Sequence, residues 1–483
     1  MVVHDDATCP FRGLAEELTQ KLAIALQRIE ALEKQAFGKK SEKMTPVSKA
    51  LAQGESAEAA EAKREAGLAK RRARQALKEA LRKQMIVHHV TEAQAACPAC
   101  GDTANKPVGA GKSTTIYEYV PGYFVQQEHV QEKLACRCGG FIATADPPRK
   151  VALKGRYGPG FIAHLCVMKC ADSIPLYRLA KQYERIGIPM TRQTLTDLFH
   201  AAAEKLTPLA DRLLALIAQC PVVQADETPI KMQNPKRRGY VWTFVADDLI
   251  GYAFAPSRSG DTPVLVLGGS QGTLVVDAYT GYNRVTAVGG RDRAGCLAHV
   301  RRKFFDARGS AQVEADETLA LILAVYRVEH EVKQRGLVRT DMHLDLRQTA
   351  GRDAMDALHA WLIAAQPRHG PKTPIGNAIG YALGQWPYLM RFLGDVRIPP
   401  DNNASERALR VVALGRKNFL FVGDEGHGEH LAVLYSLIAT CEAHDIDPTA
   451  YLRDVLLRID VTEPADFDDL LPHRWQQPDD WLA

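Results

Sequence analysis

The chain has 483 residues, of which 46% are hydrophobic and 24% are charged, and its formal net charge is +4. A length of this order favours about three domains, and the composition is that of a folded, soluble protein. The sequence shows no N-terminal apolar leader and no apolar run approaching the roughly 18 residues of a membrane span, so we expect a cytoplasmic protein with no membrane partner.

Residues 14–36 predict a coiled coil within an N-terminal segment at 1–43. Apolar residues recur there at alternating spacings of three and four, among them Leu18, Leu22, Ile29 and Leu32. This pattern is typical of a helix that buries one narrow seam. Self-association, most simply as a homodimer through this zipper, is the preferred interpretation, and packing against another part of the same chain is the alternative.

A linker and a basic helix are predicted for residues 44–90. The helix at 61–84 is rich in arginine and lysine and includes Arg71, Arg72 and Arg74. Runs of charge are usually solvated helix faces, but few acidic residues interrupt this one. A solvated face and contact with DNA phosphates are therefore equally well supported interpretations of this helix.

Two close cysteine pairs predict a structural zinc site in a ribbon-like module at 91–150. The ligands would be Cys97, Cys100, Cys136 and Cys138, since four thiolates complete a tetrahedral Zn²⁺ site. Reduced thiols fit ten cysteines in a chain of this length better than disulfides do. Residues 109–114 resemble a phosphate-binding loop but lack its first glycine, so we interpret them as a hairpin loop.

Residues 151–220 predict a helical, helix-turn-helix-like region that binds DNA. A turn at 187–190 separates two amphipathic helices, and Thr191 is suited to cap the second. Arg192 and Gln193 would then face outward toward DNA. A generic helical hairpin is the alternative.

The following segments predict a ribonuclease-H-like catalytic core with a helical insertion. Strands are expected at 222–226, 240–246, 250–255 and 273–277, with a helix at 261–268. Further helices are expected over 309–396, at 401–412 and at 431–441. The fold class is thus multidomain α/β, with a core at 221–308 and 397–445, an insertion at 309–396 and a C-terminal segment at 446–483.

Three acidic residues carry the chemistry that we predict. Asp226 and Asp277 each follow a run of apolar residues just before the chain is expected to turn, and Glu406 lies in the early turns of a predicted helix. Each acid alone would be an ordinary turn or helix residue. Together they suit two Mg²⁺ (or Mn²⁺) ions, which activate a nucleophile and stabilise a leaving oxygen in phosphoryl transfer. The cationic residues that follow Glu406 are predicted to hold DNA phosphates: Arg407, Arg410, Arg416 and Lys417.

Several motifs resemble the DDE transposases of the insertion-sequence sixty-six family, also called TnpC-type. They are found at 37–43, in the cysteine module, at 169–178, at 225–229 and, most specifically, at 401–408 continuing to 415–418. The resemblance implies Asp226, Asp277 and Glu406 as the metal-binding triad of a bacterial insertion-sequence enzyme. It also implies that small accessory proteins of the same element take part.

Two further positions relate to that family. Cys296 and His299 match its Cys-x-x-His block, for which we expect either a structural brace or a DNA contact through Arg301 and Arg302. The family commonly has a second aspartate where Glu227 stands. This difference is conservative and leaves Asp226 in place.

The leading hypothesis is a DNA transposase. It would bind the terminal inverted repeats of its element, cleave the DNA with Mg²⁺ and transfer the strands to target DNA. The alternative is a catalytically decayed DNA-binding or regulatory protein of the same element. A stand-alone ribonuclease-H-type nuclease would not explain the zipper, the cysteine module or the basic helix.

Overall fold

The computed structural model describes residues 124–135, 142–144, 149–151 and 155–478, with short helical pieces at 21–22, 61, 64–69, 71–72 and 75–76. The chain divides into two compact units, residues 52–127 and the remainder. Most of the predicted coiled coil and zinc module lies outside the described residues, whereas the pieces between 61 and 76 are helical, as expected for the basic helix. None of the described helices is long and apolar enough to cross a membrane.

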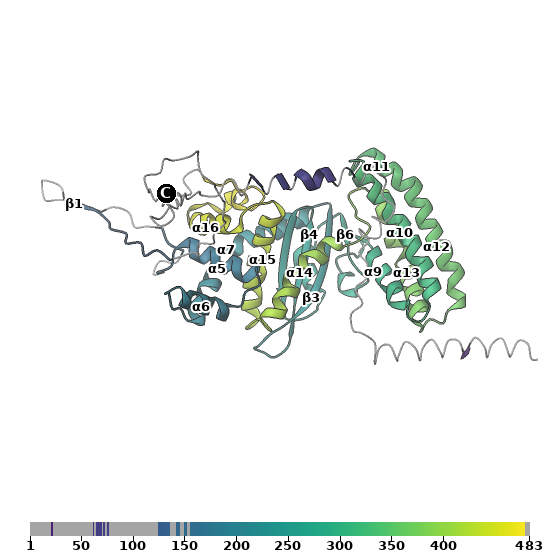
Figure 1. Ribbon diagram of the computed structural model, residues 1–483, viewed down its shortest axis with the longest axis horizontal. Helices are drawn as coiled ribbons and strands as arrows, with labels where there is room; N and C mark the ends of the chain where they lie inside the picture. Colours follow the sequence, from purple (N-terminus) through teal and green to yellow (C-terminus); the bar gives the residue numbers. More distant parts are fainter. Residues whose placement is uncertain are drawn as a thin grey trace, which may run out of the picture. The chain divides into compact units, whose positions relative to one another are not determined.

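A five-stranded mixed sheet forms the centre of the larger unit (Figure 1). The strands are β3 (Val222–Lys231), β4 (Arg238–Ala246), β5 (Leu249–Ala255), β6 (Thr273–Val275) and β7 (Asp292–Ala294). Their spatial order is β5-β4-β3-β6-β7. The strands β3, β4 and β5 pair antiparallel, whereas β6 pairs parallel with β3 and β7 pairs parallel with β6. Strand β3 therefore joins an antiparallel half of the sheet to a parallel half.

Helices cover this sheet, as the burial along β4 indicates. Consecutive residues from Val241 to Ala246 are all buried, which requires apolar packing on both faces of the strand. Helix α7 (Arg192–Gln219) and helix α15 (Glu425–Ala443) pack against β5. Helix α14 (Asn403–Asn418) packs against β3 and β4.

Side chains of α15 cover the edge of the sheet that β5 forms. The backbone N–H of Tyr252 donates to Ser436 Oγ at 2.8 Å, and that of Ile250 donates to Thr440 Oγ1 at 3.1 Å. These hydroxyls satisfy backbone groups that a neighbouring strand would otherwise pair. The edge strand is therefore not open to pairing with another chain along this stretch.

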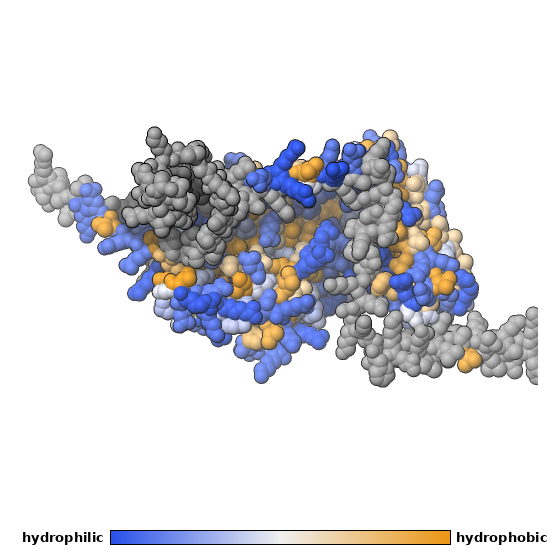
Figure 2. Space-filling view, viewed as in Figure 1, coloured by the Kyte–Doolittle hydropathy of each residue, from blue (hydrophilic) through white to orange (hydrophobic). Residues whose placement is uncertain are grey.

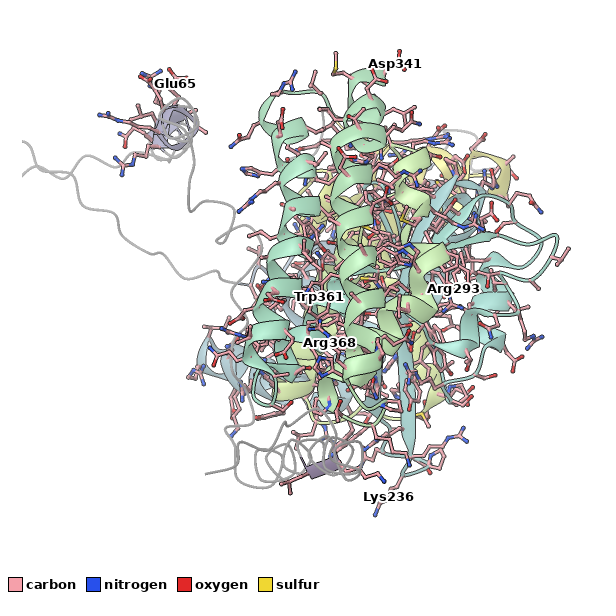
Figure 3. The ribbon with its side chains drawn as sticks, turned by 90° about the vertical axis from the view of Figure 1, so that its right-hand side faces the viewer. Glu65, Lys236, Arg293, Asp341, Trp361 and Arg368 are labelled. Atoms are coloured by element: carbon pink, nitrogen blue, oxygen red, sulfur yellow. The ribbon has the colours of Figure 1, made fainter. Side chains whose placement is uncertain are left out.

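A helical insertion follows the parallel half of the sheet. Helix α9 (Leu297–Ala307) precedes it, and its own helices are α10 (Gln312–Gln334), α11 (Asp341–Leu346), α12 (Arg352–Ala365) and α13 (Pro374–Leu389). Figure 3 shows the helices side by side, with Asp341 near one end of the bundle and Arg368 near the other. Phe304, Ile322 and Leu358 belong to one apolar core that continues to Val275 of β6. The insertion is thus packed onto the sheet rather than tethered to it.

Six further strands and α-helices are described. They are β1 (Lys133–Ala135), β2 (Ile142–Thr144), α5 (Pro159–Cys170), α6 (Leu176–Arg185), α8 (Asp261–Leu267) and α16 (Pro448–Arg458). In the predicted helix-turn-helix-like region, the Thr191 side chain accepts a hydrogen bond from the N–H of Thr194 and caps α7 as expected.

Two predicted strands require correction, and a third strand was not predicted. Strand β3 does not turn at Thr228 but continues to Lys231, because its antiparallel pairing with β4 persists through the Pro229–Tyr240 pair. Strand β6 ends at Val275 rather than at residue 277. Strand β7 was not predicted, since three residues that include Asp292 and Arg293 carry no apolar signal.

Candidate active site at the end of the parallel strands

Asp226 of β3 and Asp277, which follows β6, occupy equivalent positions relative to the pairing of these two strands. Gln224 of β3 and Val275 of β6 form the last residue pair of the parallel pairing. Asp226 lies two residues after Gln224, and Asp277 lies two residues after Val275. Their carboxylates are held by backbone groups: the N–H of Glu227 donates to Asp226 Oδ1 at 2.9 Å, and that of Tyr279 donates to Asp277 Oδ1 at 2.8 Å. Both acids thus lie where the parallel pairing ends and the strands diverge.

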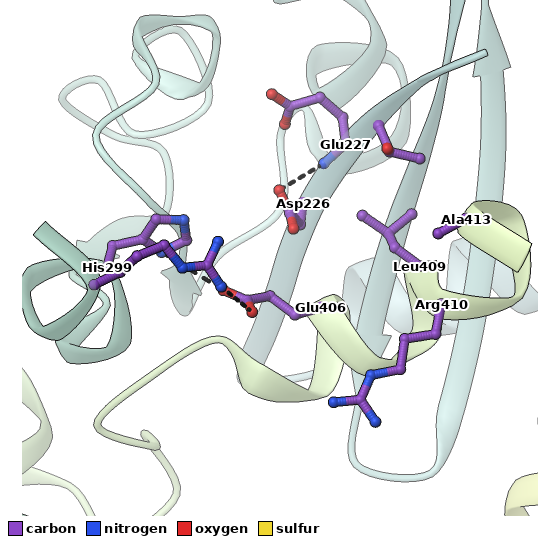
Figure 4. A pocket seen from close by; sticks show the side chains of 9 residues that line it. Asp226, Glu227, His299, Glu406, Leu409, Arg410 and Ala413 are labelled. Carbon is purple, nitrogen blue, oxygen red and sulfur yellow. Dashed lines mark hydrogen bonds and ion pairs between the residues drawn. The ribbon is translucent and has the colours of Figure 1, made fainter. Parts of the chain in front are cut away.

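Helix α14 delivers the third acid, Glu406, in its first turn. The start of this helix is anchored to β3: the N–H of Ala404 donates to Gln224 Oε1 at 3.3 Å, and Asn402 Nδ2 donates to the carbonyl of Ala225 at 3.4 Å. Because Gln224 and Ala225 directly precede Asp226, these bonds fix Glu406 beside that residue. Asp226 and Glu406 line the same pocket (Figure 4).

The electrostatics of Asp226 reflect this crowding of acids. The pKa of its carboxyl is raised to about 7, mainly by burial and also by the negative charges of Glu227, Asp277 and Glu406, against a hydrogen bond from the Glu227 N–H that lowers it. A carboxyl group that resists ionisation among other carboxylates is poised to bind a cation, which would compensate the repulsion. The donor set is made of hard oxygens, as Mg²⁺ and Mn²⁺ require.

Glu227 follows Asp226 but takes part in a different network. Its side chain is 2% exposed and accepts hydrogen bonds from Arg258 Nε at 2.8 Å and from Tyr282 Oη at 2.6 Å. In Figure 4 its carboxylate is directed away from that of Asp226. Glu227 therefore has two hydrogen-bonding partners of its own, which the sequence motif alone did not reveal.

His299 and Arg302 of α9 face Glu406 from the other side of the pocket. His299 Nδ1 lies 3.8 Å from Glu406 Oε1, and Arg302 Nη2 lies 3.5 Å from Glu406 Oε2. The Cys296 thiol is buried and donates to Asn402 Oδ1 at 2.9 Å, so it braces the start of α14. Burial raises the pKa of this thiol. Among the described residues, Cys296, His299 and Glu406 also bring potential metal-ligand atoms within 4.8 Å of one another.

The helical insertion contacts the start of α14 through residues that the sequence did not single out. Tyr326 of α10 reaches Asp401, which lies two residues before α14. Arg347 is 1% exposed and donates to Glu329 and to the carbonyls of Phe392, Asp395 and Ile398. No local pattern marks these residues, because their partners lie far away in sequence.

The structure separates the predicted DNA contacts into exposed and internally bound residues. Exposed residues are Arg407 and Arg410, Lys417, Arg192 and Gln193, and, in the smaller unit, Arg71 and Arg72. Arg302 is half exposed, but Arg301 is only 9% exposed, so the prediction that Arg301 presents its guanidinium to DNA does not fit its buried position on α9. Arg416 donates to the carbonyl of Pro229 and thereby links α14 to β3. Arg74 lies outside the described residues, as do Cys97, Cys100, Cys136 and Cys138.

Comparison with known proteins relates these features to one group. A model described as the IS66 family of transposases matches residues 154–430, one for the IS66 C-terminal element matches 436–473, and one for the zinc-finger binding domain of IS66 transposase matches 94–139. Two uncharacterized proteins of Sinorhizobium fredii, y4jD and y4hP, are 33% and 30% identical to this chain. The alignments cover 79% and 80% of this chain and 78% and 75% of those proteins.

Proposed function

Because this chain belongs to the IS66 family of transposases, we propose that it binds the terminal inverted repeats of its element and catalyses DNA cleavage and strand transfer at Asp226, Asp277 and Glu406. The observation that supports this most directly is the placement of the three acids: Asp226 and Asp277 each lie two residues past the last parallel pair of β3 and β6, and Glu406 lines one pocket with Asp226. Carboxylates that gather beside a pocket, one of them with a raised pKa, are candidates for metal-dependent chemistry.

The strand order supports a ribonuclease-H-like core. Three consecutive antiparallel strands lead into two parallel strands on the other side of β3. The first two acids follow the parallel ladder of β3 and β6, and the third comes from a helix packed on the same strands. The helical insertion separates the second acid from the third along the chain.

Asp226, Asp277 and Glu406 would hold two Mg²⁺ or Mn²⁺ ions. When bound, such ions lower the pKa of the attacking water or DNA hydroxyl and stabilise the leaving oxygen. The chain's own contribution is to orient the carboxylates through the backbone bonds at Asp226 and Asp277 and the anchored start of α14. Arg302 and the exposed arginines of α14 would neutralise DNA phosphates around the pocket.

The N-terminal regions would supply DNA binding and assembly. We assign Zn²⁺ to Cys97, Cys100, Cys136 and Cys138, all of which fall within the matched zinc-finger domain. The coiled coil at 14–36 would make a homodimer, which fits an enzyme that must hold two element ends. Target DNA and accessory proteins of the element complete the set of partners.

The second candidate function is that of a decayed DNA-binding protein which regulates the element. Acidic residues at all three triad positions disfavour it, since loss of catalysis releases such residues from selection for metal binding. Metal-dependent cleavage distinguishes the two functions.

The test is a cleavage assay on DNA carrying the element's ends, with Mg²⁺ or with a chelator. We expect Asp226→Asn and Glu406→Gln to bind these ends normally but to lose cleavage by at least about 100-fold, because each removes a metal ligand. Asp356→Asn, an exposed acid on α12, is the matched control and should cleave like the parent. Undiminished cleavage by Asp226→Asn would exclude the proposed site.

A further inference from the structure

A second cavity lies beside the far end of the helix that carries Glu406. Its volume is about 600 Å³, within the range of roughly 300–1,000 Å³ typical of small-molecule sites. Its walls come from the start of α6, the start of α7, the turn between β3 and β4, and the segment that follows α14. We call this cavity the α14 groove.

Aromatic and apolar side chains of the α14 groove are exposed rather than packed. Tyr177 is 47% exposed, Leu420 is 68% exposed and Phe421 is 46% exposed. Exposed apolar side chains that gather in one groove, rather than singly, indicate a binding surface. Figure 2 shows apolar side chains among hydrophilic ones in the region between α6 and α14.

The segment that presents Leu420 and Phe421 is held rigidly by backbone bonds. Val422 pairs with Met232 in a parallel bridge, and the N–H of Val422 donates to the carbonyl of Lys231 at 2.9 Å. The N–H of Asn234 donates to the carbonyl of Gly423, also at 2.9 Å. A fixed backbone that keeps apolar side chains in solvent is preorganised for a ligand, because little conformational entropy is lost on binding.

The polar lining of the groove has the chemistry of base and phosphate recognition. It includes the adjacent carboxamides of Gln233 and Asn234 in the turn between β3 and β4. It also includes Gln193, which donates to Asp197 Oδ1 at 2.7 Å, and Asn418, which donates to the carbonyl of Leu414 at 3.4 Å. Carboxamides both donate and accept, and they pair with the edges of bases. Aromatic rings that stack on bases beside cationic groups are the combination found in single-strand nucleic-acid sites.

The charged groups of the groove favour an anionic ligand. Arg192 is exposed at the start of α7, and Lys169 Nζ lies 3.1 Å from the centroid of the Phe419 ring. The one carboxylate in the lining, Asp424, already accepts from His427, both from its backbone N–H and from its ring. The neighbouring His200 ring contacts His430 at 2.9 Å between Nδ1 atoms and adds no negative charge.

The position of the groove relative to the candidate active site fits a DNA strand. Glu406 lies in the first turn of α14 and Asn418 is its last residue. At a rise of 1.5 Å per residue the two ends are about 18 Å apart. That distance corresponds to about five nucleotide steps along one DNA strand.

We propose that the α14 groove holds an unpaired nucleotide of the DNA strand, with its base stacked against Tyr177 and Phe421 and its edge bonded by the carboxamides. The proposal takes DNA as the substrate and in that respect rests on the proposed function. An apolar peptide would not neutralise the exposed guanidinium of Arg192 at the start of α7, which is why an anionic nucleotide is the better occupant.

The test measures binding of a fluorescein-labelled strand of 20 thymidines and of a 20-base-pair duplex, at physiological salt. Every protein carries Asp226→Asn so that no strand is cut. Loss of one stacked base corresponds to a change of roughly 10-fold in Kd. We therefore expect Tyr177→Ala and Phe421→Ala to weaken single-strand binding about 10-fold and duplex binding less than about twofold.

Two further substitutions separate stacking from apolar packing. Phe421→Trp should retain single-strand binding, whereas Phe421→Leu should behave like Phe421→Ala, because leucine has no ring to stack. Ile363→Ala, an exposed apolar residue of α12 in the insertion, is the control and should bind both DNAs like the parent. Unchanged binding by Phe421→Ala, equal loss for both DNAs, or full rescue by Phe421→Leu would each overturn the proposal.

The outcome is independent of catalysis. Selective loss of single-strand binding by the groove variants, together with no cleavage by the chain that retains Asp226, would support the groove and refute the proposed nuclease. Normal cleavage by the chain that retains Asp226, together with unchanged single-strand binding by the groove variants, would support the proposed nuclease and refute the groove.

Discussion

Tyr326 Oη donates a hydrogen bond of 2.8 Å to Asp401 Oδ2, and this contact connects the middle of the insertion helix α10 to the start of α14. Both residues are buried, at 7% and 8% exposure. Burial raises the pKa of the Asp401 carboxyl, which the bonds from Tyr326 and from the Asn403 N–H oppose. The insertion therefore helps to position the helix that carries Glu406.

Tyr326→Phe should lower the free energy of unfolding by about 1.5–3 kcal/mol, since it removes a hydrogen bond to a buried carboxylate. The matched control is Tyr435→Phe: Tyr435 is also buried, and its hydroxyl has no hydrogen-bond partner in the described part of the chain. Chemical denaturation of both variants checks the prediction. Equal stability of the two variants would contradict a bracing role for Tyr326.

The raised pKa of Asp226 predicts a pH-dependent stability in the absence of Mg²⁺. The folded protein retains the Asp226 proton up to about pH 7, whereas the unfolded chain releases it near the ordinary value of 3.8. The folded state thus binds more protons between these values, so the free energy of unfolding falls as the pH rises through this window.

Asp226→Asn should remove this pH dependence. At pH 8 without Mg²⁺ we expect the variant to be more stable than the parent by up to a few kcal/mol, and the difference should vanish near pH 4. Mg²⁺ should raise the melting temperature of the parent but not that of the variant. Thermal unfolding at pH 8 and pH 4, with Asp356→Asn as control, measures the stability difference between the variant and the parent. A stability difference that does not change with pH would contradict the prediction.

Glu227 should prove to be a positioning residue rather than a metal ligand. Glu227→Gln keeps the size of the side chain but weakens its bonds to Arg258 and Tyr282, at a cost of about 1–3 kcal/mol in stability. We expect this variant to cleave DNA measurably, at a Mg²⁺ concentration for half-maximal rate close to that of the parent. A large increase in that concentration would place Glu227 among the ligands instead.

Zinc content should depend on the N-terminal cysteines and not on Cys296. Elemental analysis of the purified protein should find about one Zn²⁺ per chain, and Cys97→Ser should lose most of it because a structural site needs all four ligands. Cys296→Ser should retain the metal, since this thiol is bonded to Asn402. Loss of zinc from the Cys296→Ser variant would instead indicate a site that Cys296 forms with His299 and Glu406.

The sequence was most informative where a local pattern determined the structure. Runs of apolar and aromatic residues located β4 and β5, and Thr191 marked the start of α7. The sequence placed Asp226 at a strand end, whereas it lies within β3, because pairing with a distant partner strand decides where a strand stops. The partners of Glu227 were equally hidden, since Arg258 and Tyr282 reach it only after the chain has folded.

The long interval between Asp277 and Glu406 has a consequence for synthesis on the ribosome. A nascent or truncated chain that ends before α14 contains two of the three acids but cannot assemble the set, and it also lacks the α15 hydroxyls that close the edge of β5. If the proposed function holds, incomplete products would therefore carry DNA-binding regions without the three acids needed for cleavage, and premature termination would yield inactive competitors for the element's ends.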